Sequence, residues 1–494
     1  MRVDKTLHER LAHDELPRMG LLVGDDTLTR GTGGEHAHVN PATGRVQAGV
    51  PLAGADDIDR AVVTAREALP AWRAWRPDER RNALLRLAAL IRRDRDRIAR
   101  VLTLECGTPI SGTRAMPARA CDYLEYYAGL ADKNEGRVIP IFPERALDYT
   151  LPEPYGVIAV VSTWNGGISS LARKAGAALA AGNTVVVKPM ELAPFSSMIF
   201  GLLAREAGIP AGVVSVVPGA VEAGAALVAH PGVDKISFTG GIDAARAVMA
   251  GAAHNLTPAV LELGGKSGNL VFPDADLDAA GAFAGAACMR NSGQGCVMPT
   301  RLLVHEDIHD EIVTRALRAI AAMPMGDPFD PATMIGPIVS EAHTERILAM
   351  IQRARDDHAG TLLTGGRRAD GELADGCFVE PTVFDDVRPD TAIAREEVFG
   401  PVLCVSTFRD EAQAVALAND TPYGLAGYVH TRDLARAHRV AAALDAGYVS
   451  LNGFAALPAS APFGGYKSSG HGKEGGREGL AEFTRSKNVY MPLD

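Results

Sequence analysis

Apolar and polar residues follow different periods in different parts of the chain. From residue 56 to about 131, apolar positions recur every three or four residues in an Ala- and Arg-rich stretch, which predicts helices punctuated by Pro109 and Pro117. The first fifty residues are expected to run as an extended segment with a turn at 40–44. Residues 136–154 are rich in proline and aliphatic residues, so an extended excursion should interrupt the helices there.

A regular alternation of strands and helices begins at residue 155. Short apolar runs predict strands at 157–162, 184–188, 213–217, 235–239 and 259–263. The Ala-rich stretches between them, such as 171–181 and 196–207, predict helices. This alternation is typical of βαβ units and a parallel sheet, so the expected fold class is α/β. A second α/β run is expected from 266 to about 460, and the tail, 477–494, turns strand-like at 488–491.

Composition and charge narrow the functional classes. A chain of 494 residues predicts about two to four domains, and 47% hydrophobic with 22% charged residues is typical of a globular protein. The net charge of −10, with scattered positive residues, argues against a nucleic-acid partner. No apolar run approaches the roughly 20 residues of a membrane span. The charged N-terminus lacks a secretory signal, so a cytoplasmic protein without membrane contact is expected.

The six cysteines form no C-x-x-C pair and are expected to be reduced thiols, mostly core filler. Cys296 differs because it ends the segment Gly293-Gln294-Gly295-Cys296, in a glycine-flanked turn after an Ala-rich helix. Uncrowded backbone N–H groups suit a nucleophile that needs access and an oxyanion pocket. A buried structural thiol is the alternative, and the spacing alone does not settle it.

Two further polar residues follow predicted strands. Glu262 ends the apolar strand before Leu263-Gly264-Gly265-Lys266, where a carboxylate is either a solvated strand-end charge or a general base with a raised pKa. Asn165, in Thr163-Trp164-Asn165-Gly166-Gly167, follows the strand at 157–162, at the sheet edge where α/β proteins bind ligands. Its amide could donate to a developing oxyanion or form an Asx turn.

No G-x-G-x-x-G fingerprint occurs, so a bound dinucleotide would need another strand-to-helix turn for its phosphates. The best candidate is Phe238-Thr239-Gly240-Gly241, where a strand ends, two glycines permit close backbone approach and a helix is expected to start at Asp243. An ordinary βα loop is the alternative reading of this motif.

Together these segments resemble the aldehyde dehydrogenase superfamily over nearly the whole chain. The matching motifs, in chain order, are Asn40-Pro41-Ala42-Thr43-Gly44, Trp164-Asn165, Lys188-Pro189-Met190-Glu191, Phe238-Thr239-Gly240, Glu262-Leu263-Gly264-Gly265-Lys266, Gly293-Gln294-Gly295-Cys296, Glu396-Glu397-Val398-Phe399-Gly400-Pro401 and Pro462-Phe463-Gly464-Gly465-Tyr466-Lys467-Ser468-Ser469-Gly470. Each motif is moderately specific, and their joint occurrence in this order by chance is negligible.

The resemblance implies a mechanism. Cys296 would attack the aldehyde carbon as thiolate, and its backbone N–H and the Asn165 amide would hold the oxyanion of the thiohemiacetal. Hydride would then leave to the nicotinamide, and Glu262 would activate water to hydrolyse the thioester. No metal is expected. Two alternatives are an acylating enzyme that passes the acyl group to coenzyme A, which Glu262 disfavours, and a non-catalytic binding relative.

The resemblance also implies cofactor contacts. Lys188 and Glu191 would hold the adenosine ribose and Glu397 the nicotinamide ribose. Phe399 would pack near the nicotinamide, and Trp164 would lie in the same cleft. The cofactor site would be completed by Phe238, Gly240, Gly241 and Gly264. Because a carboxylate such as Glu191 repels a 2′-phosphate, NAD is favoured over NADP. The chain departs from the family at Gly241, where serine is frequent, and so lacks a hydroxyl that could contact the pyrophosphate.

The family fold implies a Rossmann-like parallel-sheet cofactor domain at 1–130 and 153–264 and an α/β catalytic domain at 265–460. It further implies a small β oligomerisation arm at 131–152 and 477–494, which would join subunits into a homodimer or homotetramer.

The substrate stays open between two classes. Arg173 and Arg290 match arginines that grip the carboxylate in succinate-semialdehyde dehydrogenases, which implies a clamp for an anionic tail. They could instead lie at the tunnel mouth or pair with nearby acids. Leu457, near Phe463 in the substrate site, replaces a serine that often helps bind that carboxylate. With Phe454 and Met298, it favours an apolar aliphatic or aromatic aldehyde.

Overall fold

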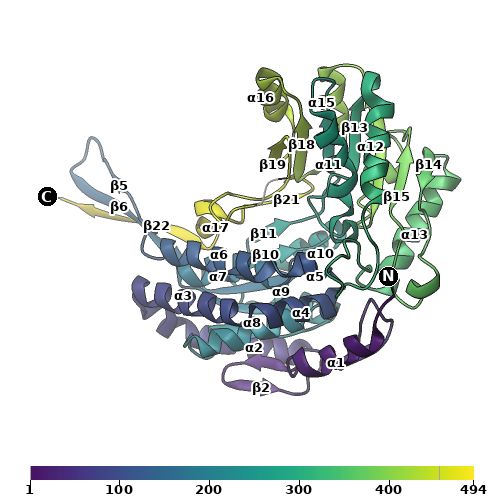
Figure 1. The fold of residues 1–494 in the computed structure, drawn as a ribbon. Coiled ribbons are helices and arrows are strands. Elements are labelled where there is room, and N and C mark those ends of the chain that lie inside the picture. Colours follow the sequence, from purple (N-terminus) through teal and green to yellow (C-terminus); the bar gives the residue numbers. More distant parts are fainter. Residues whose placement is uncertain (1, 455–456, 494) are drawn as a thin grey trace.

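Two β-sheets, each covered by helices on both faces, and a projecting arm make up the computed structural model, which describes residues 2–454 and 457–493 (Figure 1). In Figure 1 the first sheet and its helices fill the lower part, the second sheet lies at the upper right, and the arm projects to the left. The mixed α/β architecture with parallel strands confirms the predicted fold class. Among the described residues, no helix has both the length and the apolar character that a membrane crossing requires.

The first sheet contains the five strands predicted from the apolar runs, parallel to one another at its centre. An antiparallel pair, β1 and β2, extends one edge, and β21 pairs antiparallel with β11 at the other. In spatial order the strands are β2 (Asp26–Leu28), β1 (Leu21–Val23), β9 (Val214–Val216), β8 (Thr184–Pro189), β7 (Val157–Ser162), β10 (Lys235–Thr239), β11 (Ala259–Glu262) and β21 (Gly470–His471).

Alternate residues of the central strands enter two separate cores, since neighbouring side chains of a strand point to opposite faces. Ile158 and Val160 pack in the core beneath α3, α4, α6, α7 and α8, while Val157 and Ala159 pack in the core beneath α2, α9 and α10. The helices are α2 (Ala55–Ala74), α3 (Pro77–Arg93), α4 (Arg95–Cys106), α5 (Ile110–Thr113), α6 (Met116–Leu130), α7 (Gly167–Ala181), α8 (Phe195–Glu206), α9 (Val221–Val228) and α10 (Ile242–Ala253). Burial of both faces explains why these strands are continuously apolar.

The second sheet is parallel except for the pair β14 and β15. Its order is β14 (Thr361–Thr364), β15 (Thr382–Asp385), β16 (Val402–Phe408), β13 (Arg301–His305), β12 (Gly268–Val271), β18 (Ala426–His430) and β19 (Tyr448–Leu451). The helices of this part are α11 (Leu277–Met289), α12 (His309–Ala321), α13 (Glu341–Asp356), α14 (Ala392–Arg395), α15 (Glu411–Asn419) and α16 (Leu434–Ala443).

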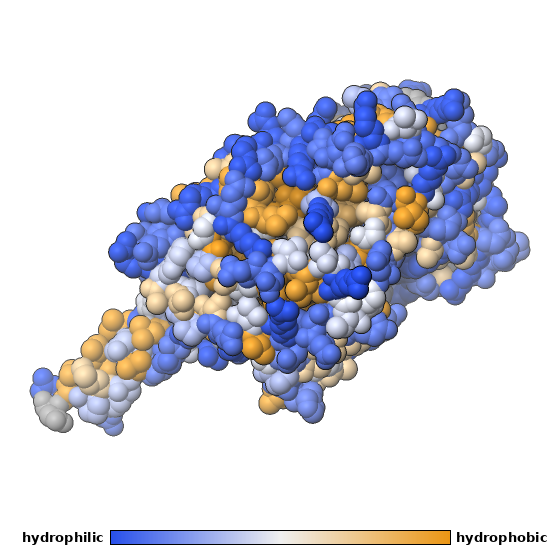
Figure 2. Space-filling view, turned by 90° about the horizontal axis from the view of Figure 1, so that it is seen from below, coloured by the Kyte–Doolittle hydropathy of each residue, from blue (hydrophilic) through white to orange (hydrophobic). Residues whose placement is uncertain are grey.

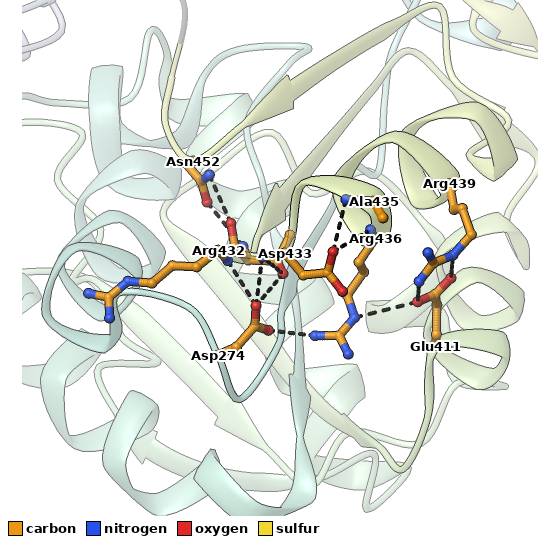
Figure 3. Close-up of polar contacts among 9 residues, drawn as sticks. Asp274, Glu411, Arg432, Asp433, Ala435, Arg436, Arg439 and Asn452 are labelled. Carbon is orange, nitrogen blue, oxygen red and sulfur yellow. Dashed lines mark hydrogen bonds and ion pairs between the residues drawn. The ribbon is translucent and has the colours of Figure 1, made fainter.

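A polar network secures the β18–β19 edge of this sheet (Figure 3). The Asp274 carboxylate, just after β12, accepts hydrogen bonds from the Thr431 hydroxyl at 2.7 Å and from the backbone N–H groups of Arg432 and Asp433 at 2.9 Å. It also pairs with the Arg436 guanidinium at 2.5 Å. These contacts tie the start of α16 to the end of β12.

The predicted extended start of the chain is wrong for residues 5–15, which form helix α1 (Lys5–Glu15). Asp4 caps this helix by accepting a hydrogen bond from the Leu7 N–H at 3.0 Å, and His8 contacts Asp327 at 2.9 Å. Because Asp327 lies 319 residues further along the chain, local periodicity could not reveal this support.

The strands that follow α1 include the antiparallel pair β3 (Glu35–Val39) and β4 (Val46–Pro51). Between them lies the predicted turn at 40–44, closed by a hydrogen bond from the Gly44 N–H to the Asn40 carbonyl at 2.9 Å.

The arm is a three-stranded antiparallel sheet of β22 (Thr484–Pro492), β6 (Ala146–Pro154) and β5 (Val138–Ile139). β22 contains the segment predicted to be strand-like, 488–491. Hydrophobic side chains gather along the arm (Figure 2), and Val138 and Phe142 are 74% and 93% exposed. The short helix before β22, α17 (Gly476–Ala481), packs against α7.

The chain passes from the first sheet to the second between β11 and β12 and returns to the first sheet at β21. The domain boundaries proposed from the sequence stay a prediction, and residues 1, 455–456 and 494 of those ranges lie outside the described residues.

Candidate active site

A cavity of about 590 Å³ opens where the loop after β7 meets the loop after α11. Its volume lies within the range of small-molecule sites. Six residues predicted to act in catalysis or substrate binding line it: Asn165, Arg173, Arg290, Cys296, Leu457 and Phe463. The remaining predicted catalytic residue, Glu262, is not part of the lining.

Cys296 is the only one of the six cysteines that is partly exposed, because the other five are buried. Its loop is tightly wound, since Asn291, Ser292 and Gly293 all have positive φ, at 49°, 55° and 74°. A Cβ on Gly293 would lie 2.0 Å from the Gly400 carbonyl oxygen, so only glycine fits there. The fold therefore places Cys296 in the lining of the cavity.

The Cys296 sulfur is densely surrounded even though the residue keeps some exposed surface. Burial, and next the carboxylates of Glu397 and Glu262, raise the pKa of the Cys296 thiol to about 12. The thiol is therefore the dominant form near neutral pH, and a nucleophilic role requires removal of its proton.

Asn165 turns its side chain toward the loop that carries Cys296. Its Oδ1 accepts a hydrogen bond from the Thr163 hydroxyl at 2.8 Å, and its Nδ2 donates to the Gln294 carbonyl at a long 3.4 Å. The same carbonyl accepts a shorter hydrogen bond, 2.9 Å, from Asn291 Nδ2. The Gln294 carbonyl thus keeps a partner if the Asn165 amide turns to a ligand in the cavity.

Glu262 ends β11 and is 3% exposed, which excludes the alternative of a solvated strand-end charge. Neither carboxyl oxygen has a hydrogen-bond partner in the described part of the chain. A Cβ on Gly464 would lie 2.8 Å from Oε1. Burial, reinforced by the nearby Glu474 carboxylate, raises the pKa of Glu262 well above its usual value. Such a carboxyl is protonated at rest and becomes a base only when it loses that proton.

Arg173 forms an ion pair with an acidic residue, which is the alternative to a carboxylate clamp named in the sequence analysis. Its Nε lies 2.6 Å from Oε2 of Glu474, whose other oxygen contacts the fully buried ammonium of Lys174. Burial opposes the charge of Arg173, but the Glu474 carboxylate, together with Tyr123 and Glu262, outweighs burial, and the pKa of Arg173 is raised. The guanidinium also stacks over the Phe463 ring, 5.3 Å from its centroid. Arg173 lines the cavity with its charge already compensated.

Arg290 differs from Arg173 in having no ion-pair partner among the residues that the structure describes. It is exposed, and its guanidinium lies over the Phe454 ring, 5.3 Å from the centroid. The Phe454 ring in turn stacks on the Tyr428 ring, with the two centroids 5.7 Å apart. The Tyr428 hydroxyl donates a hydrogen bond to the backbone carbonyl of Val297, the residue after Cys296.

The predicted adenosine and phosphate contacts lie at the carboxyl ends of β8 and β10. Lys188 is the penultimate residue of β8 and is buried, so its pKa is lowered, and Glu191 follows in the next turn. Gly241 is the N-cap of α10, with no capping side chain, and a Cβ there would meet no atom within 4 Å. A Cβ on Gly240 would lie 2.4 Å from the ring of Phe238. The open turn at a helix N-terminus suits a pyrophosphate.

The predicted nicotinamide contacts gather on the other side of the Cys296 loop. A Cβ on Gly264 would lie 2.0 Å from Oε2 of Glu397, and Glu397 Oε1 accepts a hydrogen bond from the Gly265 N–H at 3.0 Å. Burial raises the pKa of Glu397 to about 7. The Trp164 and Phe399 rings meet edge to face at 5.5 Å. Together these side chains provide an aromatic wall and a carboxylate for a ribose hydroxyl.

Several residues that hold this site were not foreseen. His343 and Arg346, on α13, bind the backbone carbonyls of the Glu397–Phe399 segment at 2.9–3.0 Å. Their spacing along an ordinary amphipathic helix gives no signal. Lys174 is the exception, because a lysine inside the Ala-rich helix α7 could have indicated a buried partner.

A group of metal-ligating side chains, His309, Asp385 and Asp386, lies elsewhere, and none of the three lines the cavity. His309 and Asp385 are already paired at 2.9 Å.

Comparison with known proteins agrees with this geometry. A profile of the aldehyde dehydrogenase family matches residues 29–489. The chain is similar to a Burkholderia cenocepacia protein assigned to the aldehyde dehydrogenases, with 39% identity over 97% of this chain and 98% of that one and a TM-score of 0.94. It is similar to PnpE from Pseudomonas sp. WBC-3, with 38% identity over 97% and 98% of the two chains and a TM-score of 0.94.

The chain is also similar to the betaine aldehyde dehydrogenase of Staphylococcus aureus, with 34% identity over 99% of this chain and 97% of that one and a TM-score of 0.95. Both PnpE and the Staphylococcus aureus enzyme have been solved in complex with nicotinamide adenine dinucleotide.

Proposed function

The chain belongs to the aldehyde dehydrogenase family, and from that premise we propose that it oxidises an aldehyde to a carboxylic acid with NAD, through a thioester on Cys296. The observation that carries the proposal is that the Cys296 thiol and the Asn165 amide line one cavity, with the Glu262 carboxyl buried beside it. These are a nucleophile, an oxyanion donor and a base for one acyl-transfer sequence.

The first steps use the side chains around the cavity. Cys296 releases its proton to solvent and its sulfur attacks the aldehyde carbon, so that a C–S bond forms and the carbonyl oxygen gains negative charge. The Cys296 N–H and the Asn165 amide donate hydrogen bonds to that oxygen. Asn165 can do so because Asn291 also binds the Gln294 carbonyl. NAD, when bound, supplies the acceptor for the hydride that leaves the tetrahedral carbon.

The last step releases the acid. The ionised Glu262 takes a proton from water, hydroxide attacks the thioester carbon, and the C–S bond breaks; the released thiolate then takes that proton from Glu262, which returns the thiol and the carboxylate. The shielding that raises the pKa of Glu262 makes its carboxylate a stronger base once ionised.

The residues at the cofactor contacts fit NAD. Lys188 and Glu191 would bind the adenosine ribose, the N-terminus of α10 at Gly241 would bind the pyrophosphate, and Glu397 would bind the second ribose. The carboxylate of Glu191 disfavours a 2′-phosphate and supports NAD over NADP. The NAD complexes of PnpE and the Staphylococcus aureus enzyme support the same choice.

We also infer that the arm joins subunits into a homo-oligomer, because Val138 and Phe142 are 74% and 93% exposed on a sheet with little core of its own. Replacing both with arginine should reduce the mass of the particle in solution, measured by light scattering after size exclusion. Leu434→Arg, on a helix away from the arm and 72% exposed, is the control. An unchanged mass in the arm variant would show that the arm is not the interface.

The experiment that tests the catalytic proposal is NADH absorbance over a panel of straight-chain, aromatic and semialdehyde substrates. Cys296→Ala should abolish NADH formation and leave NAD binding intact, since the cofactor contacts lie on other residues. Cys377→Ala, which removes a buried thiol outside the cavity, is the matched control and should keep turnover. A Cys296→Ala protein that still forms NADH would overturn the proposal.

A further inference from the structure

The charged side chains that line the substrate cavity are all cationic. Its lining contains three arginines, Arg119, Arg173 and Arg290, and no aspartate or glutamate among the described residues. Residues 455–456, which the structure does not describe, are both alanine in the sequence and therefore add no acid. This asymmetry occurs in a protein with a net charge of −10. A cationic lining in an acidic protein favours an anionic ligand over a neutral one.

Only two of these arginines are free to meet a ligand. Arg173 is compensated by Glu474, and moving it would leave Oε2 of that buried carboxylate without its partner. Arg119 and Arg290 are exposed residues that line the cavity, and neither has an ion pair in the part of the chain that the structure describes. They come from separate elements, Arg119 from the first turn of α6 and Arg290 from the segment after α11.

The guanidinium of Arg290 is also held in place by an aromatic ring. Its guanidinium lies over the Phe454 ring, so the side chain is supported on one face while its N–H groups point outward in the plane of the guanidinium. A planar, partly fixed guanidinium is well suited to bind a carboxylate through two parallel hydrogen bonds.

The rest of the lining is apolar and polarisable. Four methionines, Met116, Met298, Met323 and Met334, line the same cavity as Phe454 and Leu457. Thioether and aromatic side chains favour an unsaturated or aromatic ligand body. The cavity therefore combines a reactive cysteine, an apolar middle and cationic groups.

On the premise of the proposed function, we infer that the preferred substrate is an aldehyde with an apolar, unsaturated or aromatic body and a carboxylate at its far end. The carboxylate is met by Arg119 and Arg290, and Arg173 stays with Glu474. This assigns Arg119 as a specificity-determining residue and unites the two substrate classes, since the ligand is both anionic and apolar.

The test compares two probes of nearly the same shape, 4-formylbenzoate and its neutral methyl ester, by NADH formation. The wild-type enzyme should have a KM for the carboxylate at least tenfold below that for the ester. Added NaCl should raise only the KM of the carboxylate, because salt screens the attraction. Arg119→Leu and Arg290→Leu should each raise the KM of the carboxylate about tenfold and leave the ester unchanged, as expected for a lost charge-assisted hydrogen bond.

Arg114→Leu is the matched control, because Arg114 is an exposed arginine of the same region that does not line the cavity, and it should change neither KM. Equal KM values for acid and ester in the wild-type enzyme would overturn the inference while leaving the proposed function intact. So would arginine variants that affect both probes alike. Absence of NADH formation from every aldehyde would instead overturn the proposed function.

Discussion

Arg173 and Glu474 form an ion pair with an Nε–Oε2 distance of 2.6 Å at the wall of the substrate cavity, across 301 residues of sequence. The Glu474 carboxylate also contacts Lys174, so that one acid compensates both the fully buried Lys174 and the partly buried Arg173. It acts on Glu262 as well, since Glu474 raises the pKa of Glu262 while Arg173 and Lys174 lower it. The pair therefore links the substrate cavity to the acid–base group of the proposed reaction.

Glu474→Gln should destabilise the fold. Removing one member of a buried ion pair leaves the charge of Arg173 and Lys174 uncompensated, which costs about 3–5 kcal/mol in free energy of unfolding. Urea denaturation followed by circular dichroism measures it. Asp26→Asn is the control, because the Asp26–Arg60 pair has side chains 58% and 50% exposed and should contribute about 1 kcal/mol or less. Equal losses in the two variants would contradict the assignment.

The same Glu474→Gln substitution should shift the pH dependence of thioester hydrolysis to lower pH. Glu262 is active as its carboxylate, so the rate rises as pH passes its raised pKa. Loss of the Glu474 charge removes one cause of that raised pKa and frees Arg173 to lower it further. Single-turnover release of the acid, measured across pH on the folded fraction, reports the shift. An unchanged profile would show that Glu474 does not act on the base, and a profile displaced to higher pH would contradict the direction of its effect.

Glu262→Gln should stall the enzyme after hydride transfer, because the amide cannot accept a proton from water. A covalent acyl adduct on Cys296 should then accumulate, with one equivalent of NADH formed in a burst and steady turnover reduced by at least 100-fold. Intact-mass spectrometry detects the adduct directly. Normal turnover without an adduct would show that another group is the base.

The parallel strands of the first sheet were predictable because burial on both faces makes each strand a short apolar run. β7 and β10 occur at the predicted residues. Elements supported by distant partners were not predictable. Helix α1 depends on Asp327, and β21 joins the sheet only after the chain has completed the second sheet. Local periodicity contains no information about such contacts.

The residues of the candidate site also divide into those that the sequence could indicate and those that it could not. Cys296, Asn165 and Glu262 stand in short motifs whose glycines are required by close contacts, so the motifs located them. Glu474 stands in no such motif, and its importance arises only where β21 and its flanking loop return beside α7. The role in substrate binding that the resemblance implies for Arg173 stays a prediction, and the partner that compensates its charge, Glu474, could not be identified because it is remote in sequence.

The Cys296 thiol should alkylate slowly at neutral pH and faster as pH rises. Because burial raises its pKa to about 12, the thiolate fraction increases about tenfold for each pH unit between 7 and 9.5, and the rate should follow it. Iodoacetamide labelling of the apoenzyme, followed by peptide mapping, measures this rate. The five buried cysteines should stay unlabelled in the native protein. A rate that levels off below pH 9 would contradict the raised pKa.

Gly241→Ser should tighten NAD binding. The φ of Gly241 is −79°, which any residue adopts, and a Cβ there meets no atom within 4 Å, so serine fits without strain. Its hydroxyl would stand at the N-terminus of α10, where the pyrophosphate is proposed to bind. One added hydrogen bond of about 0.5–1.5 kcal/mol corresponds to a dissociation constant roughly two- to tenfold lower, which isothermal titration calorimetry resolves.

The control is Gly129→Ser, an exposed position in α6 that is equally open and should leave NAD binding unchanged. If Gly241→Ser binds NAD no better or more weakly, the pyrophosphate does not lie against this turn, and the phosphate contact must be sought at another strand end of the first sheet.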